Sequence, residues 1–162
     1  MSDPYRGHKN AFSRYTTGVT VVSCLPDGHE PLGITVNSFT SVSLEPTLVL
    51  WCLDRRSSVF GHFMSADNYA VSILNAAQQP LSIRFATPGR HNFLPDETES
   101  FATGAPLLKD RLAGFDCRIW DRKDAGDHVI LIGEVVHHDY SDDEPLIYSG
   151  RQYLQGRPIG SN

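Results

Sequence analysis

The chain has 162 residues, a formal net charge of -5 and a sequence pI near 5.7. A chain of this length is expected to form one domain, which can bury roughly two-thirds of its unfolded surface without disulfides. Its acidic balance disfavours general binding to nucleic acid or to an anionic membrane, so we expect neither as a partner.

The cysteines and the ends of the chain bear on its location. Cys24, Cys52 and Cys117 are widely spaced and odd in number, and each lies in or beside an apolar run. This pattern predicts buried thiols in a reducing compartment rather than disulfides or metal ligands. The N-terminus has no apolar core of signal-peptide length, and no window approaches the ~18 apolar residues of a membrane span. We therefore expect a cytoplasmic protein.

The first predicted element is a short amphipathic helix laid on the body of the domain. Ser2 or Asp3 can cap this helix, with Pro4 in its first turn. Large side chains recur at steps of three or four residues, at Tyr5, His8, Phe12 and Tyr15.

Strands follow this helix. Residues 19–25 and 31–36 are apolar and rich in β-branched side chains, and Pro26-Asp27-Gly28 between them is typical of a turn, so a hairpin is expected. After a turn at Glu45-Pro46 the pattern predicts a strand over 47–53, a helix over 58–66, a strand over 69–74 and a helix over 80–86.

Residues 87–105 are dominated by loop formers, and we interpret this long segment as a flap over the site. Strands are predicted again over 112–120, 129–138 and 145–153, with the turn between the first two at 124–127. Many strands, few short helices and no βαβ rhythm indicate a mainly β, closed or nearly closed antiparallel barrel. Residues 155–162 are polar and glycine-rich and are expected to fray.

The stretch over residues 33–58 has two polar parts. Small hydroxyl and amide side chains crowd the segment between two predicted strands, among them Thr35, Asn37, Ser38 and Ser41. The second strand ends in Asp54-Arg55-Arg56-Ser57-Ser58, where guanidinium groups and hydroxyls precede a helix, a pattern that binds anions. A flat heteroaromatic ligand with a phosphate tail suits both parts. The alternatives are an ordinary strand-to-loop transition and a solvated charged turn.

Six segments, in order along residues 12–153, carry a family resemblance. They are TGVTVV (17–22), GITVNSFTSVS (33–43), CLDRRS (52–57), RFA (84–86), GDH (126–128) with GEV (133–135), and residues 145–153. In these segments the chain resembles the short-chain flavin reductases, the reductase partners of two-component flavin-dependent monooxygenases. The run TVNSFTSVSL is far more specific than any short glycine motif.

The resemblance implies an FMN-binding split β-barrel of antiparallel Greek-key type, as one domain over residues 1–162 that forms a homodimer with flavin sites near the subunit interface. The implied activity is an NAD(P)H:flavin oxidoreductase, which reduces FMN or FAD for a separate monooxygenase. Hydride transfer needs little acid–base machinery, because the cofactors carry the chemistry. The alternative is a flavin-binding barrel that does not accept nicotinamide. NADH versus NADPH and FMN versus FAD stay open.

The resemblance also assigns site residues. His128 is implied to position NADH, with a hydrogen-bonded structural histidine as the alternative. Phe85 is implied to pack near the cofactor, although it could equally be core, and aromatic packing at a dimer interface is the alternative for the C-terminal tyrosines. The segment over 87–105 departs from the family pattern. The cofactor-binding candidates are Thr35, Val36, Asn37, Ser38, Ser41, Cys52, Leu53, Asp54, Arg55, Arg56, Ser57, Ser58, Arg84, Phe85, Tyr148, Arg151 and Tyr153.

No metal is expected. His137 and His138 are adjacent, so on a strand their side chains point to opposite faces and cannot share a metal ion. The remaining histidines show no paired ligand spacing.

Overall fold

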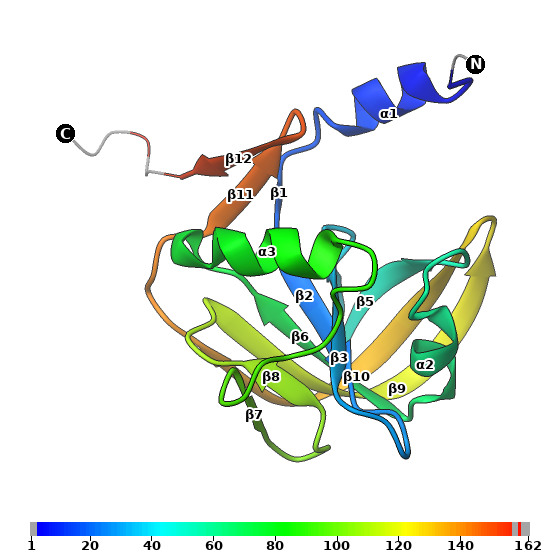
Figure 1. Cartoon of the computed structure of the whole chain (residues 1–162), viewed down its shortest axis with the longest axis vertical. Coiled ribbons are helices and arrows are strands. Elements are labelled where there is room, and N and C mark those ends of the chain that lie inside the picture. Colours follow the sequence, from blue (N-terminus) through cyan, green and yellow to red (C-terminus); the bar gives the residue numbers. More distant parts are fainter. Residues whose placement is uncertain (1–2, 157–158, 160–162) are drawn as a thin grey trace.

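The computed structural model describes residues 3–156 and residue 159. This part of the chain lies mainly in strands, which a few short helices connect (Figure 1), so the predicted mainly β fold is confirmed. The helices are α1 (Arg6–Phe12), α2 (Phe60–Ser65), η1 (Ala76–Gln78) and α3 (Gln79–Ala86). The strands are β1 (Thr17–Gly18), β2 (Thr20–Cys24), β3 (Leu32–Val36), β4 (Thr40–Leu44), β5 (Thr47–Asp54), β6 (Asn68–Ile73), β7 (Thr98–Ser100), β8 (Pro106–Leu108), β9 (Ala113–Ala125), β10 (His128–Tyr140), β11 (Leu146–Ser149) and β12 (Gln152–Gln155).

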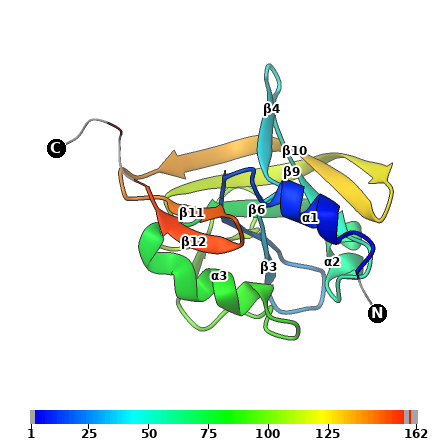
Figure 2. The same cartoon turned by 90° about the horizontal axis from the view of Figure 1, so that it is seen from above.

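One antiparallel sheet of seven strands forms the body, in the order β3-β2-β6-β9-β10-β5-β4. The predicted β2–β3 hairpin is present, and the long β9–β10 hairpin turns at Gly126, whose φ of +65° favours glycine. β1 pairs with β11, which pairs with β12, and β7 pairs with β8. Figure 2 shows β4 standing out at one edge of the body.

The main core lies on the inner face of β5. Val49, Trp51 and Leu53 alternate with half-buried or exposed neighbours, the period expected of a strand with one buried face, and each is at most 3% exposed. The Trp51 ring lies 5.0 Å from that of Phe63 on α2 and 6.0 Å from that of Tyr69 on β6, measured between ring centroids. This packing fixes α2 on the sheet. It thereby also positions the charged loop, residues 54–58, which precedes the helix.

A second cluster holds α3 between the sheet and the β11–β12 hairpin (Figure 1). Phe85 on α3 is fully buried together with Val21, Leu74 and Leu146, and Tyr153 of the hairpin packs against the cluster. The hairpin is therefore anchored to the body through α3.

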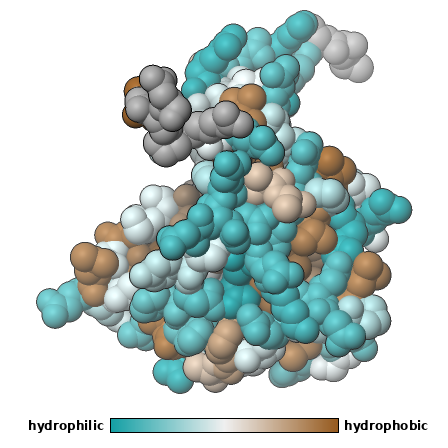
Figure 3. All heavy atoms as spheres, turned by 90° about the vertical axis from the view of Figure 1, so that its left-hand side faces the viewer, coloured by the Kyte–Doolittle hydropathy of each residue, from teal (hydrophilic) through white to brown (hydrophobic). Residues whose placement is uncertain are grey.

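Helix α1 corrects one expectation. The helix forms, but none of its residues is buried, and Tyr5, Phe12 and Tyr15 are 65%, 73% and 79% exposed. It stands away from the body beside the β11–β12 hairpin (Figures 1 and 2), so the prediction that it lies on the body is wrong. Gly150 N donates to Ser13 O at 2.8 Å and so ties this segment to the hairpin. In Figure 3 the upper part of the molecule is a narrow, mostly hydrophilic projection on a broader body.

The start of α1 also differs from the prediction. Tyr5 is the N-cap residue and makes no side-chain cap hydrogen bond, although Tyr5 N donates to Asp3 Oδ1 at 3.0 Å. Ser2 lies outside the described residues.

Three further segments differ from the predictions. β4 was not expected, because its residues face solvent and show no buried alternation. Residues 87–105, predicted to lack regular structure, contain the short strand β7, and Gly33 N donates to His91 O at 2.8 Å along the edge of β3. The single strand expected over 145–153 is the hairpin of β11 and β12, which turns at Gly150.

Of the tail expected to fray, residues 157–158 and 160–162 lie outside the described part. Within that part, no helix is long and apolar enough to cross a membrane.

Candidate functional site

Asn37, just after β3, lies where three neighbouring hollows meet. The hairpin pocket, of about 180 Å³, lies between β3, α3 and the β11–β12 hairpin, and its lining residues are Val19, Thr35, Val36, Asn37, Ser82, Ala86, Tyr148 and Tyr153. The helix hollow, of about 740 Å³, is lined by Asp3, Arg6, Lys9, Phe12, Ser13, Asn37, Tyr148 and Arg151. The strand hollow, of about 570 Å³, is lined by Phe12, Tyr15, Thr17, Asn37, Ser38, Phe39 and Thr40. The polar stretch predicted to bind a ligand therefore faces open space.

Hydrogen bonds organise the hairpin pocket. Thr35 Oγ1 donates to Ser82 O at 2.7 Å, and the hydroxyls of Ser82 and Tyr153 are 2.7 Å apart. Tyr148 and Tyr153 lie directly opposite each other on β11 and β12, with ring centroids 5.4 Å apart. The pocket thus has a polar floor, formed by β3 and α3, and an aromatic wall, formed by the hairpin.

Asn37 itself is exposed, and its side-chain amide makes no hydrogen bond to another described residue. A free amide offers both donors and an acceptor, which matches the mixed donor and acceptor edge of a flavin ring. The hairpin pocket alone is smaller than the roughly 300–1,000 Å³ typical of ligand sites, but each of the two adjoining hollows, of about 740 and 570 Å³, lies within that range. The residues present therefore fit a flavin.

The charged loop, residues 54–58, holds its guanidinium groups against carboxylates. Arg56 N and Nε donate to Asp54 Oδ1 at 2.8 and 3.1 Å, and Arg56 Nη2 lies 2.8 Å from Asp54 Oδ2. These contacts, the side-chain bond first, lower the pKa of Asp54 to about 2. Arg55 pairs with Asp124 across the β9–β10 turn. Because exposed ion pairs are weak, a phosphate can compete for both guanidinium groups.

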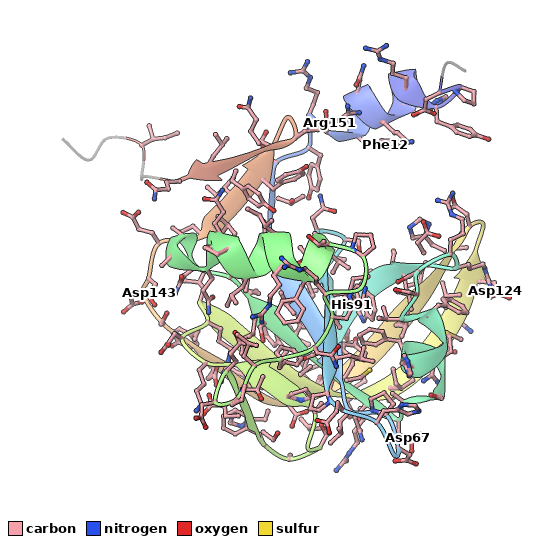
Figure 4. The ribbon with its side chains drawn as sticks, in the orientation of Figure 1. Phe12, Asp67, His91, Asp124, Asp143 and Arg151 are labelled. Carbon is pink, nitrogen blue, oxygen red and sulfur yellow. The ribbon has the colours of Figure 1, made fainter. Side chains whose placement is uncertain are left out.

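His128 begins β10 directly opposite Asp54. Its Nδ1 lies 2.7 Å from Asp127 Oδ1, a contact that lowers the pKa of the Asp127 carboxyl, and the His128 side chain is 39% exposed. The structure thus brings His128 together with the charged loop rather than with Tyr148 and Tyr153. In Figure 4, Arg151 labels the hairpin side at the top of the molecule, and Asp124, the partner of Arg55, lies on the right flank.

Ser38 and Cys52 connect the two sides. Ser38 Oγ accepts a hydrogen bond from Cys52 N at 3.0 Å, which fixes the segment after β3 against β5. Leu53 is 1% exposed and points into the core, so only its backbone can meet a ligand. Ser41 lies exposed on β4, opposite Val49, and lines none of the three hollows.

Arg84 and Phe85 lie apart from the hollows. Both guanidinium nitrogens Nη1 and Nη2 of Arg84 bind the Glu97 carboxylate, at 2.8 and 2.6 Å. Phe85 is fully buried, with its ring centroid 4.8 Å from that of Phe93. The geometry therefore supports the core alternative for Phe85 and gives Arg84 a role in holding the 87–105 segment.

His91 is a neighbour of the charged loop that the sequence did not suggest. Its Nε2 lies 3.2 Å from Ser58 Oγ, and its Nδ1 lies 3.0 Å from Gly33 O (His91 is labelled in Figure 4). It lies in a segment without periodicity, so no pattern in the sequence indicated that it reaches Ser58. Among the described residues, no three His, Cys, Asp or Glu side chains are placed to hold a metal ion.

The antiparallel sheet, the hairpin and α1 thus surround Asn37 with hollows that have room for a small molecule, and a charged loop lies to one side of them. The comparisons with known proteins specify the class. The flavin reductase like domain model matches residues 12–157. The chain is 44% identical over 146 residues, 90% of its length, to FMN reductase (NADH) SmoA of Agrobacterium fabrum, of which it covers 82%. The chain belongs to the flavin reductase-like domain family.

Two further relatives extend this result. The NADH:FAD oxidoreductase SgcE6 of Streptomyces globisporus, solved in complex with NAD and FAD fragments, superposes with a TM-score of 0.86 at 33% identity, with 99% of each chain covered. A probable flavin reductase of Rhizobium meliloti is 38% identical over 98% of this chain, which spans 50% of that protein's length.

Proposed function

We propose that this protein is an NAD(P)H:flavin oxidoreductase that passes a hydride from a nicotinamide to FMN or FAD and supplies the reduced flavin to a separate monooxygenase. The observation that carries the proposal is the convergence of three hollows on the free amide of Asn37. The printed names of the relatives, an FMN reductase (NADH) and an NADH:FAD oxidoreductase, support the same reaction.

In this proposal the flavin supplies the redox chemistry and the protein supplies binding and orientation. Thr35, Val36, Asn37 and Ser38 hold the polar edge of the flavin, in part through backbone groups. The charged loop, with Arg55, Arg56, Ser57 and Ser58, binds its phosphate. Tyr148 and Tyr153 exclude water from one wall of the pocket, and His128 with Asp127 positions the nicotinamide.

We also propose a homodimer in the cytoplasm. Directly opposite residues of an antiparallel pair share one face, so Cys52 with Ile130 and Leu50 with Ile132 form an apolar stripe on the outer face of β5 and β10. The neighbouring edge strand β4 exposes Leu44 by 87%. A second copy of the chain is the occupant that suits this stripe, and Leu50→Asp should convert the dimer to a monomer in light scattering. The three cysteines are free and two of them are buried, which supports a reducing compartment.

The proposed function is tested by NADH and NADPH oxidation with flavin-stripped protein and added FMN, FAD or no flavin. We expect oxidation that requires flavin and saturates with it. Asn37→Ala should weaken flavin binding about tenfold, whereas Asn10→Ala, an exposed amide outside the hollows, should not change it. If the protein binds flavin but oxidises neither NADH nor NADPH with either added flavin, the result would favour the alternative, a flavin-binding barrel that does not use nicotinamide.

A further inference from the structure

His91 is held firmly against the edge strand β3. Gly33 N donates to His91 O at 2.8 Å. On the same edge, Leu32 and Asn92 form an antiparallel bridge, and the ring of Phe93 packs against the second core cluster. The main chain on both sides of His91 is therefore fixed, which gives its half-buried imidazole (labelled in Figure 4) a defined position.

The two ring nitrogens of His91 have different partners, and these partners determine which nitrogen carries the hydrogen. Nδ1 lies 3.0 Å from Gly33 O. A carbonyl oxygen only accepts, so Nδ1 is the nitrogen that carries hydrogen in the neutral ring. Nε2 then has a free lone pair and lies 3.2 Å from Ser58 Oγ, so it accepts the hydrogen bond of the Ser58 hydroxyl. While His91 is neutral, the hydroxyl hydrogen of Ser58 is therefore not available to a ligand.

Protonation of His91 reverses the hydrogen bond to Ser58. A proton taken up from solvent at Nε2 makes both ring nitrogens donors, so Nε2 now donates to Ser58 Oγ. The hydroxyl hydrogen of Ser58 is thereby released for another acceptor. Histidine changes its charge at roughly pH 5–8, so the reversal lies within the ordinary working range of a protein.

The surroundings of Ser58 favour an anion as that acceptor. Two successive tight turns, closed by backbone hydrogen bonds of 3.0 Å over residues 54–57 and 57–60, place Ser58 in the same exposed loop as Arg55 and Arg56. A hydroxyl donor beside two guanidinium groups suits phosphate oxygens, which only accept when ionised.

The charged side chains on the elements around His91 leave it without a partner of its own. They are the pairs Arg55–Asp124, Arg56–Asp54, His128–Asp127 and Arg84–Glu97 and, within its own segment, Arg90 and Asp96. Among the described residues, no carboxylate forms an ion pair with His91. An anionic ligand at Ser58 would therefore supply the negative charge that a protonated His91 lacks.

We propose that His91 is a positioning residue for the phosphate of the flavin, and that binding of this phosphate is coupled to protonation of His91. The protonated ring donates to Ser58 Oγ, and the Ser58 hydroxyl donates to a phosphate oxygen that also meets the guanidinium groups of the loop. The only transfer is one proton, from solvent to Nε2. Coupling between two binding events is reciprocal, so FMN binding takes up protons and a lower pH tightens FMN binding.

This inference rests on the proposed function, because it takes the charged loop as the phosphate site. Its test compares FMN with riboflavin, which lacks the phosphate, by fluorescence titration without nicotinamide in phosphate-free buffers. His91→Gln offers a donor and an acceptor, as the neutral ring does, but does not titrate. Dividing the Kd of His91→Gln by that of wild type at each pH cancels the ionisation of the FMN phosphate itself.

We expect this ratio for FMN to rise from about one at about pH 8.5 to about ten at about pH 5.5. The ratio for riboflavin should stay within about twofold over the same range. His138→Gln, which changes an exposed histidine of β10, should match wild type with both flavins. A histidine that only supports the fold would shift both flavins alike and would not produce a phosphate-dependent pH profile.

Two further measurements test the path through Ser58. Ser58→Ala should give the same pH profile as His91→Gln, because the protonated ring then has no hydroxyl to reorient. Calorimetric titration of wild type with FMN at about pH 7.5, in two buffers of different ionisation enthalpy, should show proton uptake that riboflavin does not cause. The phosphate is mostly a dianion at this pH, since its second pKa is about 6, so its own ionisation contributes no uptake on binding to cations. This measurement needs no variant.

Three results would overturn the inference. One is an FMN ratio for His91→Gln that stays within about twofold at every pH. Another is a wild-type pH profile in Ser58→Ala, and the third is equal proton uptake with FMN and with riboflavin. The proposed function fails separately: if FMN binds but neither NADH nor NADPH is oxidised, the titrations still decide the role of His91, because they contain no nicotinamide.

Discussion

Tyr153 on β12 and Ser82 on α3 share a hydrogen bond of 2.7 Å between their hydroxyls, although 71 residues separate them in the chain. Ser82 is fully buried and its backbone carbonyl also accepts the hydrogen bond from Thr35. This pair of residues connects the hairpin, the helix and the central sheet at the wall of the hairpin pocket. The Tyr153 hydroxyl thus adds a polar contact to the apolar packing that positions the hairpin.

Tyr153→Phe removes that hydroxyl and leaves the buried Ser82 hydroxyl without its partner. We expect a loss of about 1–2 kcal/mol in the free energy of unfolding and weaker flavin binding, both measured on the same preparation by denaturant titration and flavin fluorescence. Tyr140→Phe is the control, because Tyr140 is 78% exposed. Unchanged stability in Tyr153→Phe would show that the hydrogen bond contributes nothing to hairpin docking.

His128→Ala tests the positioning role. Without the imidazole, we expect kcat/KM for NADH to fall about tenfold, or ~1.4 kcal/mol, with flavin affinity unchanged. His138→Ala, an exposed histidine on the same strand, should match wild type. Stopped-flow NADH oxidation and flavin titration measure the two quantities. Wild-type rates in His128→Ala would remove the assigned role and leave a structural histidine.

The Asp54–Arg56 pair predicts a specific acid sensitivity. The pKa of Asp54 is lowered from its ordinary value of 3.8 to about 2, mainly by the Arg56 side chain. The stability that this shift contributes is present above the ordinary value and is lost as the pH falls from 3.8 to about 2. The effect is small, because solvent screens an exposed pair.

Unfolding midpoints at a series of pH values test this. Asp54→Asn should lose less stability than wild type over that window, and Asp142→Asn, an exposed carboxylate with no hydrogen bond to a described residue, should follow wild type. Parallel acid profiles for wild type and Asp54→Asn would contradict the prediction.

Gly133 on β10 is tightly enclosed. A Cβ at this position would lie 2.6 Å from Tyr69 Cζ and 2.9 Å from Cys117 Cβ, both in the buried core. Gly133→Ala should therefore lower the free energy of unfolding by about 1–3 kcal/mol. Gly61→Ala on α2, where a Cβ meets nothing within 4 Å, should raise it by about 0.5 kcal/mol. Thermal denaturation of both variants checks the pair, and equal melting temperatures would refute it.

The regular elements could be predicted where one face is buried. Trp51 and Leu53 alternate with less buried neighbours, so the strand is visible in the sequence. β4 is an exposed edge strand, in which Leu44 is 87% exposed. Its sequence therefore shows no alternation of buried and exposed residues. The spacing of Tyr5 and Phe12 correctly predicts a helix, but helical periodicity cannot say what an apolar face contacts, and here no described residue covers it.

The site could be predicted in part for a similar reason. Asn37 and Ser38 belong to one contiguous polar stretch, which the sequence displays directly. The contacts of His91 with Ser58 and of Arg84 with Glu97 depend on how residues 87–105 fold back on β3, and loop sequences do not encode that path in any period. His128 was expected beside the nicotinamide. Asp127 precedes it in the chain, but its cross-strand neighbour Asp54 follows from strand register, which periodicity alone does not determine.

The backbone bond between Gly33 and His91 has a consequence for solubility. β3 is an edge strand, and an uncovered edge invites pairing with another chain. Here a largely irregular segment covers that edge, and the Arg84–Glu97 ion pair holds the segment in place. Proteolytic cleavage of the segment, or loss of Glu97, therefore uncovers the edge of β3 while the barrel is still folded. The uncovered edge is then a template for aggregation.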